Sequence, residues 1–489
     1  MGIIAKQSFY NSLSIALAFL IGAINTLYLY PTHMGSRLQG LVVALLALSN
    51  LVQPFISFGV QHAVIKFYSS CETNAEKDKL LSFSLFLPLL VFSLLLIFTL
   101  FFKNQITDFI GSENQEIGKY AYLILAVAFS TALFEVFYNW LRIQLYSVFG
   151  NFLKEFFPRA LIFMLLLIYA FGGMDLDGFI TALILGYYFR LLTVVIYSLM
   201  KYTPKLSFAL PIQFKSIMRY SLLIFMSGTA ASLILDIDKS MISNILTVEN
   251  VAYYSVAIFI AAVIEFPGRA MFQIISPLVA MALNDKDDLT LLQLLKKSAN
   301  NLLLVSGLMF LLINLNLNDF YAWINLGDYT VALEVVLIVS VGKLFTMSMG
   351  CLNNIITNSK YYAYVFWFSI SSAILAVLLN LYLIKLYGII GAAYATLIVI
   401  VIINVLKILL VQFKFKINPY GWESLFTLGI IILLYLIISK ISFEFDPFVS
   451  LLLRSMLITV AFALLAYFLK LTDDVQQFLG KILPFVKKS

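Results

Sequence analysis

Long apolar runs separated by short polar segments fill the sequence from one end to the other. Most runs have about the 17–25 residues that an α-helix needs to cross a lipid bilayer. A transmembrane β-barrel would instead show strict alternation of inward and outward residues, which this sequence lacks. The pattern predicts an all-α integral membrane protein with about fourteen transmembrane helices. These predicted helices cover residues 9–30, 38–62, 80–102, 119–140, 156–172, 178–200, 217–246, 251–282, 302–316, 331–352, 361–384, 389–411, 425–441 and 449–469.

The composition agrees with this class. Hydrophobic residues make up 62% of the 489 residues and charged residues only 12%, whereas soluble proteins contain about 25% charged residues. The net charge of +7 does not indicate a nucleic-acid partner, because the basic residues are scattered through short loops. Two cysteines and two histidines at distant positions form neither a disulfide framework nor a metal cluster. We therefore expect no metal and no other cofactor.

The distribution of the 32 lysine and arginine residues predicts the orientation in the membrane. With the N-terminus inside, most of them fall in inner loops and tails, and few fall in outer loops. Such an excess marks the cytoplasmic side. The prediction is a multi-pass protein with both termini in the cytoplasm.

A weak internal repeat divides the chain. Gly59 and Gly268, and likewise Glu135 and Lys343, recur at a spacing of about 210 residues, as expected for parallel repeats in a transporter. The last two helices fall outside the repeat. The predicted domains are residues 1–205 (helices 1–6), 206–412 (helices 7–12) and 413–489 (helices 13–14 and a cytoplasmic tail).

The seventh predicted helix carries Asp236, Asp238 and Lys239 at membrane depth. Each such charge costs roughly 2.5–3.5 kcal/mol on insertion scales, so these residues are expected to face a wet cavity or a partner. Asp236 and Lys239 are three residues apart and can neutralise each other on one helix face. Asp238 lies about 200° around the helix from Asp236, so the two carboxylates cannot both face one cavity.

The eighth predicted helix carries Glu265 and Arg269, four residues apart on one face. One interpretation is a self-satisfying ion pair. The other begins from Pro267, which removes the helical partner of the Val263 carbonyl and predicts a kink with a free carbonyl. In that case Glu265 is a candidate ion site at a hinge or binding wall.

Other ionisable residues stand alone on their predicted helices. Glu135 has no basic residue within one turn, so it is either a neutral, hydrogen-bonded structural carboxyl or a carboxylate that binds and releases protons. Lys343 is likewise alone, and the repeat suggests that it pairs with Glu135 across a cleft in one conformation. Arg190 either reaches the membrane surface or pairs with a carboxylate, and Arg454 is predicted to be structural.

Three stretches resemble bacterial polysaccharide-type flippases of the multidrug/oligosaccharidyl-lipid/polysaccharide exporter superfamily. They are DKSMISNILTVENVAYYSVA near Asp238, YGIIGAAYATL at residues 387–397 and the glycine-containing region 34–69. The resemblance implies a flippase that moves an isoprenoid-diphosphate-linked oligosaccharide across the bacterial inner membrane by alternating access, for cell-envelope polysaccharide biosynthesis. It implies Na⁺ or H⁺ coupling, contact with membrane lipids, and polysaccharide-assembly membrane proteins as further partners.

On that resemblance, the charges receive predicted roles. Basic groups in an apolar cleft suit a diphosphate, and carboxylates suit a coupling ion. The predicted substrate-binding residues are Arg190, Arg269 and Lys343. The predicted coupling-ion residues are Glu135, Asp236, Asp238 and Glu265. The predicted structural or gating residues are Lys239, Pro267 and Gly391.

Two other functions stay open at this point. One is a cation-coupled drug or metabolite exporter of the same superfamily, although a cavity for cationic drugs should be net acidic and the intramembrane charges here are slightly more basic than acidic. The other is a membrane-embedded oligosaccharide polymerase or ligase. Such enzymes need a large external loop with catalytic groups, and the loops here are short. We expect a transporter and not an enzyme.

Overall fold

The computed structural model describes residues 3–68, 70–110, 113–144, 146–472 and 476. The described residues form helices and connecting segments and contain no strand. The chain divides into two compact units, Met1–Ser255 and Val256–Ser489. The predicted division at residues 205 and 412 stays a prediction, and the end of the predicted cytoplasmic tail, residues 477–489, lies outside the described residues.

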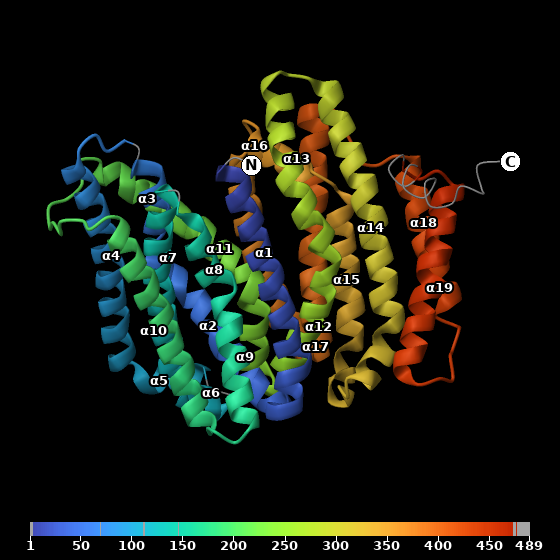
Figure 1. Ribbon diagram of the computed structural model, residues 1–489, viewed down its shortest axis with the longest axis horizontal. Helices are drawn as coiled ribbons and strands as arrows, with labels where there is room; N and C mark the ends of the chain where they lie inside the picture. The colour runs from blue at the N-terminus through green and yellow to red at the C-terminus, as the bar shows by residue number, and fades with distance from the viewer. Residues whose placement is uncertain (1–2, 69, 111–112, 145, 473–475, 477–489) are drawn as a thin grey trace. The chain divides into compact units, whose positions relative to one another are not determined.

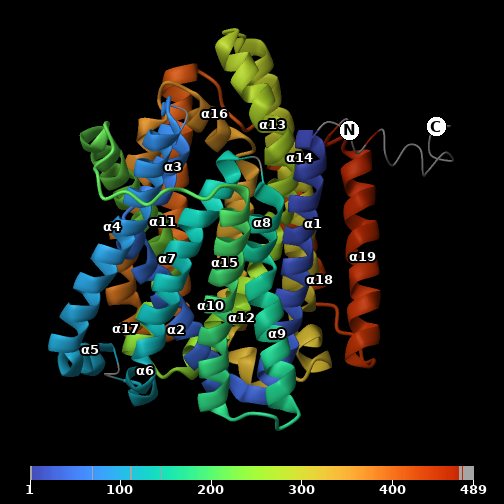
Figure 2. The same ribbon diagram turned by 60° about the vertical axis from the view of Figure 1, so that its left-hand side comes forward.

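The first unit is built around α7, which packs against α2, α3 and α10 (Figures 1 and 2). A π-helical stretch, η1, joins α1 to α2 without a loop. The helices of this unit are α1 (Ile3–Ile24), η1 (Asn25–Met34), α2 (Gly35–Ser57), α3 (Val60–Tyr68), α4 (Asn74–Phe101), α5 (Lys103–Ile110), α6 (Gln115–Lys119), α7 (Ala121–Ile143), α8 (Ser147–Glu155), α9 (Phe157–Ala170), α10 (Leu176–Lys201), α11 (Phe214–Ile245) and the start of α12 (Glu249–Ala262).

The second unit is organised around α14, which packs against α13, α15, α18 and α19 (Figure 1). Its core contains Phe310, Ile431 and Phe462, all buried. After the end of α12, the helices of this unit are η2 (Val263–Glu265), α13 (Phe266–Asn284), α14 (Asp288–Trp323), η3 (Gly327–Ala332), α15 (Leu333–Ser348), α16 (Leu352–Asn358), α17 (Ala363–Phe415), α18 (Trp422–Ile438) and α19 (Pro447–Phe468).

The predicted all-α membrane fold is confirmed, and each predicted transmembrane run is mainly helical where the structure describes it, although turns interrupt some of them, as at residues 58–59. Among the described residues, nine helical segments are long and apolar enough to cross a membrane. Two of them, Leu13–Ser57 and Ala363–Phe415, each cover most of two of the predicted helices. The prediction for residues 302–316 was too short, because α14 begins at Asp288 with polar turns that the hydrophobic pattern does not mark.

A glycine turn separates the two helices that α17 contains. Gly388 has φ 60° and ψ −138°, a conformation that breaks the helix and that residues with a β-carbon adopt only with strain. Three residues later, a β-carbon at Gly391 would lie 2.0 Å from the carbonyl oxygen of Leu383. The tight turn between the predicted helices 361–384 and 389–411 therefore requires glycine at both positions.

Close backbone packing also fixes α2 against the turn between α11 and α12. A β-carbon at Gly40 would lie 1.9 Å from the carbonyl oxygen of Val248. The Asn114 side chain holds the same turn: its Nδ2 donates to the carbonyl oxygens of Ser243 (2.6 Å) and Leu246 (2.9 Å), and its Oδ1 accepts from the Val248 N–H (2.9 Å). The end of α11 is thus anchored to segments from the first part of the chain.

Candidate substrate-binding and coupling residues

The charged residues of α11 are partnered inside the first unit. Lys239 Nζ lies 2.8 Å from Asp236 Oδ1, so the predicted pair three residues apart is formed. Asn50 of α2 donates from Nδ2 to the other carboxylate oxygen of Asp236 at 3.1 Å. Both charged side chains are largely buried, with 14% of Asp236 and 23% of Lys239 exposed. The result is a carboxylate shared between a cation on its own helix and an amide on a neighbouring helix.

Asp238 has a different partner. The hydroxyl of Tyr254, on α12, donates to its Oδ2 at 2.6 Å, and both side chains are buried. The two carboxylates of α11 therefore have separate surroundings, as their positions around the helix predict. Tyr254 was not among the predicted site residues, although the tyrosine pair that opens this apolar run was visible in the sequence.

Glu135 has no basic neighbour on its own helix, as predicted, but it has a partner on another helix. Lys154 Nζ, from α8, lies 2.7 Å from Glu135 Oε1. Asn139, which the sequence places one turn away, donates to the backbone carbonyl of Glu135 and not to its carboxylate. Residue spacing predicts only contacts between neighbours on one helix, whereas this cation comes from the next helix along the chain.

Lys343 is not alone either. Its Nζ lies 3.1 Å from Glu265 Oε1, and 23% of each side chain is exposed. In the described part of the second unit, Glu265 thus pairs with Lys343 and not with Arg269, which is exposed. The expected pairing of Glu135 with Lys343 assumed that neither residue has another partner. Each of them has one within its own compact unit.

The α-helix is interrupted just before Pro267, where a kink was predicted. Residues Val263–Glu265 form a short 3₁₀ helix, and Pro267 lies in the first turn of α13, where its missing N–H needs no helical partner. The Val263 carbonyl was predicted to be free. This prediction was wrong, because the carbonyl accepts a hydrogen bond from the Phe266 N–H. The neighbouring Ile264 carbonyl accepts from Ser306 Oγ at 2.9 Å.

Arg190 is the most buried of the candidate cations, with 4% of the residue exposed. Its Nη2 donates to Thr131 Oγ1 at 3.0 Å, and its guanidinium lies 4.4 Å from the Phe134 ring centroid and 4.7 Å from that of Tyr187. Its Nε has no hydrogen-bond partner. Among the ion pairs of the described residues none involves Arg190, so this buried cation keeps a donor available.

Arg454 joins α19 to α14. It donates to the carbonyl oxygen of Leu315 at 3.0 Å and forms an ion pair with Asp319. Both partners lie on α14, so the contact fastens the last helix to the core of the second unit. This geometry fits the structural role predicted for Arg454.

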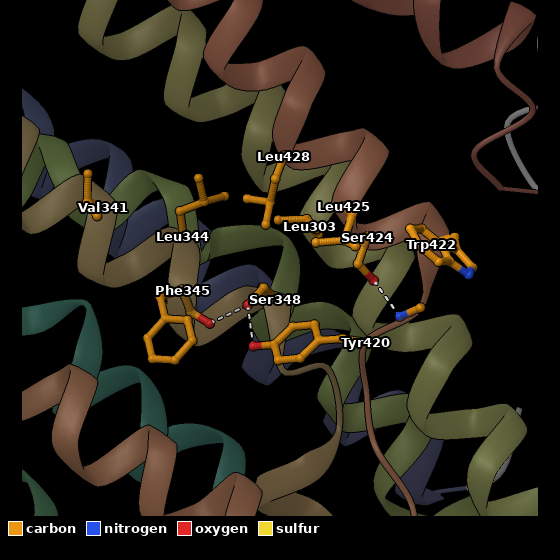
Figure 3. Close-up of a pocket in the computed structure, with 11 residues that line it drawn as sticks. Leu303, Val341, Leu344, Phe345, Ser348, Tyr420, Trp422, Ser424, Leu425 and Leu428 are labelled. Carbon is orange, nitrogen blue, oxygen red and sulfur yellow. Dashed lines mark hydrogen bonds between the residues drawn. The ribbon is translucent and has the colours of Figure 1, made fainter.

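A cavity of about 620 Å³ lies within the second unit, between α14, α15 and the start of α18 (Figure 3). Its walls are mainly aliphatic and aromatic, and Ser348 and Tyr420 form a hydrogen bond of 3.0 Å at its edge. This cavity could not be predicted from the sequence, because its lining comes from three segments far apart in the chain. The described residues contain no group of His, Cys, Asp and Glu that could hold a metal.

Many long apolar helices that carry ion pairs define the class of this protein, a multi-pass membrane protein. Among solved structures, the chain is similar to lipid II flippase MurJ in an inward closed conformation, with 17% identity, a TM-score of 0.73, and coverage of 94% of this chain and 98% of that chain. It is also similar to an inward-facing multidrug resistance MATE family transporter of the MOP superfamily, with 16% identity, a TM-score of 0.61, and coverage of 84% and 94%. A third similar structure is a MOP superfamily transporter from Pyrococcus furiosus, with 13% identity, a TM-score of 0.56, and coverage of 85% of this chain and 95% of that chain.

The sequence itself identifies the family. Residues 39–314, more than half of the chain, match the family described as "Polysaccharide biosynthesis protein". The chain belongs to this family. No curated protein sequence is similar enough to count as a match. The family and the fold thus confirm the resemblance to polysaccharide-type flippases found in the sequence motifs.

Proposed function

We propose that this protein is a transporter that flips an isoprenoid-diphosphate-linked oligosaccharide from the inner to the outer leaflet of the bacterial cytoplasmic membrane. The observation that carries the proposal is the family match to polysaccharide biosynthesis proteins on a fold shared with a lipid II flippase. The family match supports a polysaccharide precursor as the substrate, and the fold shared with a lipid II flippase supports a lipid carrier for it. No covalent chemistry is required of the protein.

The ion pairs suggest how substrate and coupling ion could be exchanged. Glu135, Asp236 and Glu265, which all lie within predicted transmembrane runs, each pair with a lysine. A diphosphate that binds the lysine of such a pair leaves its carboxylate available for Na⁺ or H⁺, because each charge then keeps an opposite partner. We therefore keep Lys343 as a substrate contact and Glu135, Asp236, Asp238 and Glu265 as coupling residues.

Arg190 and Arg269 complete the proposed substrate contacts. A guanidinium offers planar paired donors that match phosphate oxygens. Arg190 has a donor without a partner, and Arg269 is exposed. Because Arg190 is also fixed between two rings, a lysine in its place would keep the charge and lose the ring contacts and part of the hydrogen bonding.

The test is a flipping assay on the protein reconstituted in liposomes with a fluorescent isoprenoid-diphosphate oligosaccharide. We expect Arg190→Ala to reduce the initial rate at least tenfold and Arg190→Lys to keep part of it. Lys205→Gln, a substitution of an exposed lysine outside the helices, serves as the control. Transport of a cationic drug without any flipping of the lipid-linked substrate by the wild type would contradict the proposal and favour a drug exporter.

The proposed orientation places both termini in the cytoplasm of the cell. We expect a cysteine at Asn74 to resist a membrane-impermeant maleimide in intact cells, and a cysteine at Asn104 to react. Both positions are exposed, so access to reagent decides the result. Burial and the nearby Glu76 raise the pKa of the native Cys71 thiol, which slows its reaction because the thiolate is the nucleophile.

Replacing Cys71 with serine removes the remaining background in this experiment. Modification of the Asn74 cysteine in intact cells would overturn the orientation.

A further inference from the structure

A second cavity, of about 530 Å³, lies in the first unit between α1, α8 and α10. Its wall on α1 is formed by Tyr10, Leu13 and Leu17, which recur at the spacing of one helix face. Phe149 and Phe152 of α8 form the opposite wall. Figure 2 shows α1 and α8 side by side, as their contacts require. We call this cavity the α1–α8 groove.

The groove is long and apolar. From Tyr10 to Leu17 the α1 wall extends about 10 Å along the helix axis. The hydroxyl of Ser14, which also lines the groove, donates to the carbonyl oxygen of Tyr10 at 2.9 Å and is satisfied within its own helix. The groove therefore presents methyl, methylene and ring surface along its length, which suits a hydrocarbon chain.

A cation stands at one end of the groove. Lys201, in the last turn of α10, lies with its Nζ 4.5 Å from the ring centroid of Tyr146 and 5.3 Å from that of Tyr197. Both tyrosines line the groove. Lys201 is exposed, and none of the ion pairs among the described residues includes it. Two rings fix the ammonium in place while leaving it open to an anion.

The ends of the groove match the two ends of a lipid. Lys201 lies at the end of α10 that the basic-residue distribution assigns to the cytoplasm, where the headgroups of the inner leaflet lie. From that end, the apolar α1 wall leads into the bilayer. An amphiphile with an anionic head would place its phosphate on Lys201 and one chain along α1. A zwitterionic lipid would gain less, because its own cation repels the ammonium.

We propose that the α1–α8 groove is a binding site for an anionic phospholipid of the inner leaflet. The bound lipid is a resident of the membrane, distinct from the transported oligosaccharide lipid. The lipid joins α1 to α8 and α10, so it belongs to the first compact unit of the protein. Its orientation rests on the proposed topology, which the cysteine labelling experiment tests separately.

The test is native mass spectrometry of the purified protein released from micelles containing equal amounts of phosphatidylglycerol and phosphatidylcholine. We expect the wild type to retain phosphatidylglycerol preferentially, and Lys201→Gln to reduce that preference about fivefold, the effect of one lysine near a lipid surface. Lys205→Gln, four residues further along and also exposed, is the matched control and should retain the preference. Leu17→Trp fills the groove and should reduce retention while Lys201 remains.

Three results would overturn the proposal. They are equal retention of the two lipids by the wild type, an equal loss in the two lysine variants, and displacement of phosphatidylglycerol by an isoprenoid phosphate at the same concentration. The last result would assign the groove to the transported lipid. Since the measurement is lipid retention, a failure of the flipping assay leaves this test intact.

Discussion

Replacing Gly391 with alanine is expected to lower the apparent melting temperature of the purified protein by several degrees and to reduce its yield. The added β-carbon would lie 2.0 Å from the carbonyl oxygen and 2.4 Å from the carbonyl carbon of Leu383. Both are backbone atoms, so no side chain can move aside, and the turn at Gly388 must open. Overpacking of this kind costs about 1–3 kcal/mol and occasionally more.

The control for this experiment is Gly429→Ala in α18. A β-carbon at Gly429 meets no atom within 4 Å, so the substitution adds no clash. It should leave the melting temperature unchanged or raise it, because alanine favours a helix over glycine by up to about 1 kcal/mol. Equal melting temperatures for Gly391→Ala and wild type would show that the turn has room and that glycine is not required there.

The helices could be predicted from the sequence because their signal is local. An apolar run of spanning length has one stable solution in a bilayer, a helix that satisfies its own backbone. The pair of Asp236 and Lys239 was also predictable, since residues three apart on one helix face must meet. The interruption of the helix just before Pro267 was predictable from the missing N–H of proline.

The other pairs could not be predicted, because they depend on packing between helices. Lys154 reaches Glu135 from α8, and Lys343 reaches Glu265 from α15. Neither contact leaves a spacing in the sequence. Of the two interpretations of Glu265 and Arg269, the ion pair between them was wrong for the same reason, because Glu265 pairs instead with Lys343 of α15.

The structure changes what these charges can do. A lone carboxylate at membrane depth would bind a proton on its own, whereas a paired one must first lose its lysine. The ion pairs of Glu135, Asp236 and Glu265 each place a lysine ammonium and a carboxylate within about 3 Å of each other, the distance of a hydrogen-bonded ion pair. In the proposed transporter, binding of the diphosphate and of the coupling ion would therefore favour each other at the same pair.

The pair of Glu265 and Lys343 provides the sharpest test of this idea. Removing one charge leaves the other largely buried without a partner, so we expect Lys343→Gln to destabilise the protein and to abolish flipping. The cost for a fully buried pair is about 3–5 kcal/mol, and solvent reaching this partly exposed pair should reduce it to about 1–3 kcal/mol. Glu265→Gln should destabilise it similarly.

The double variant Glu265→Gln with Lys343→Gln should recover most of the stability, because no unpaired charge remains. It should not recover flipping, since the lysine that contacts the diphosphate and the carboxylate that accepts the ion are both gone. The exchanged variant Glu265→Lys with Lys343→Glu restores a pair in the reverse order. If both variants regain stability and flipping, the pair is only structural; if only stability returns, the positions of the two charges matter for transport. Thermal unfolding and the liposome assay on the same preparations separate these outcomes.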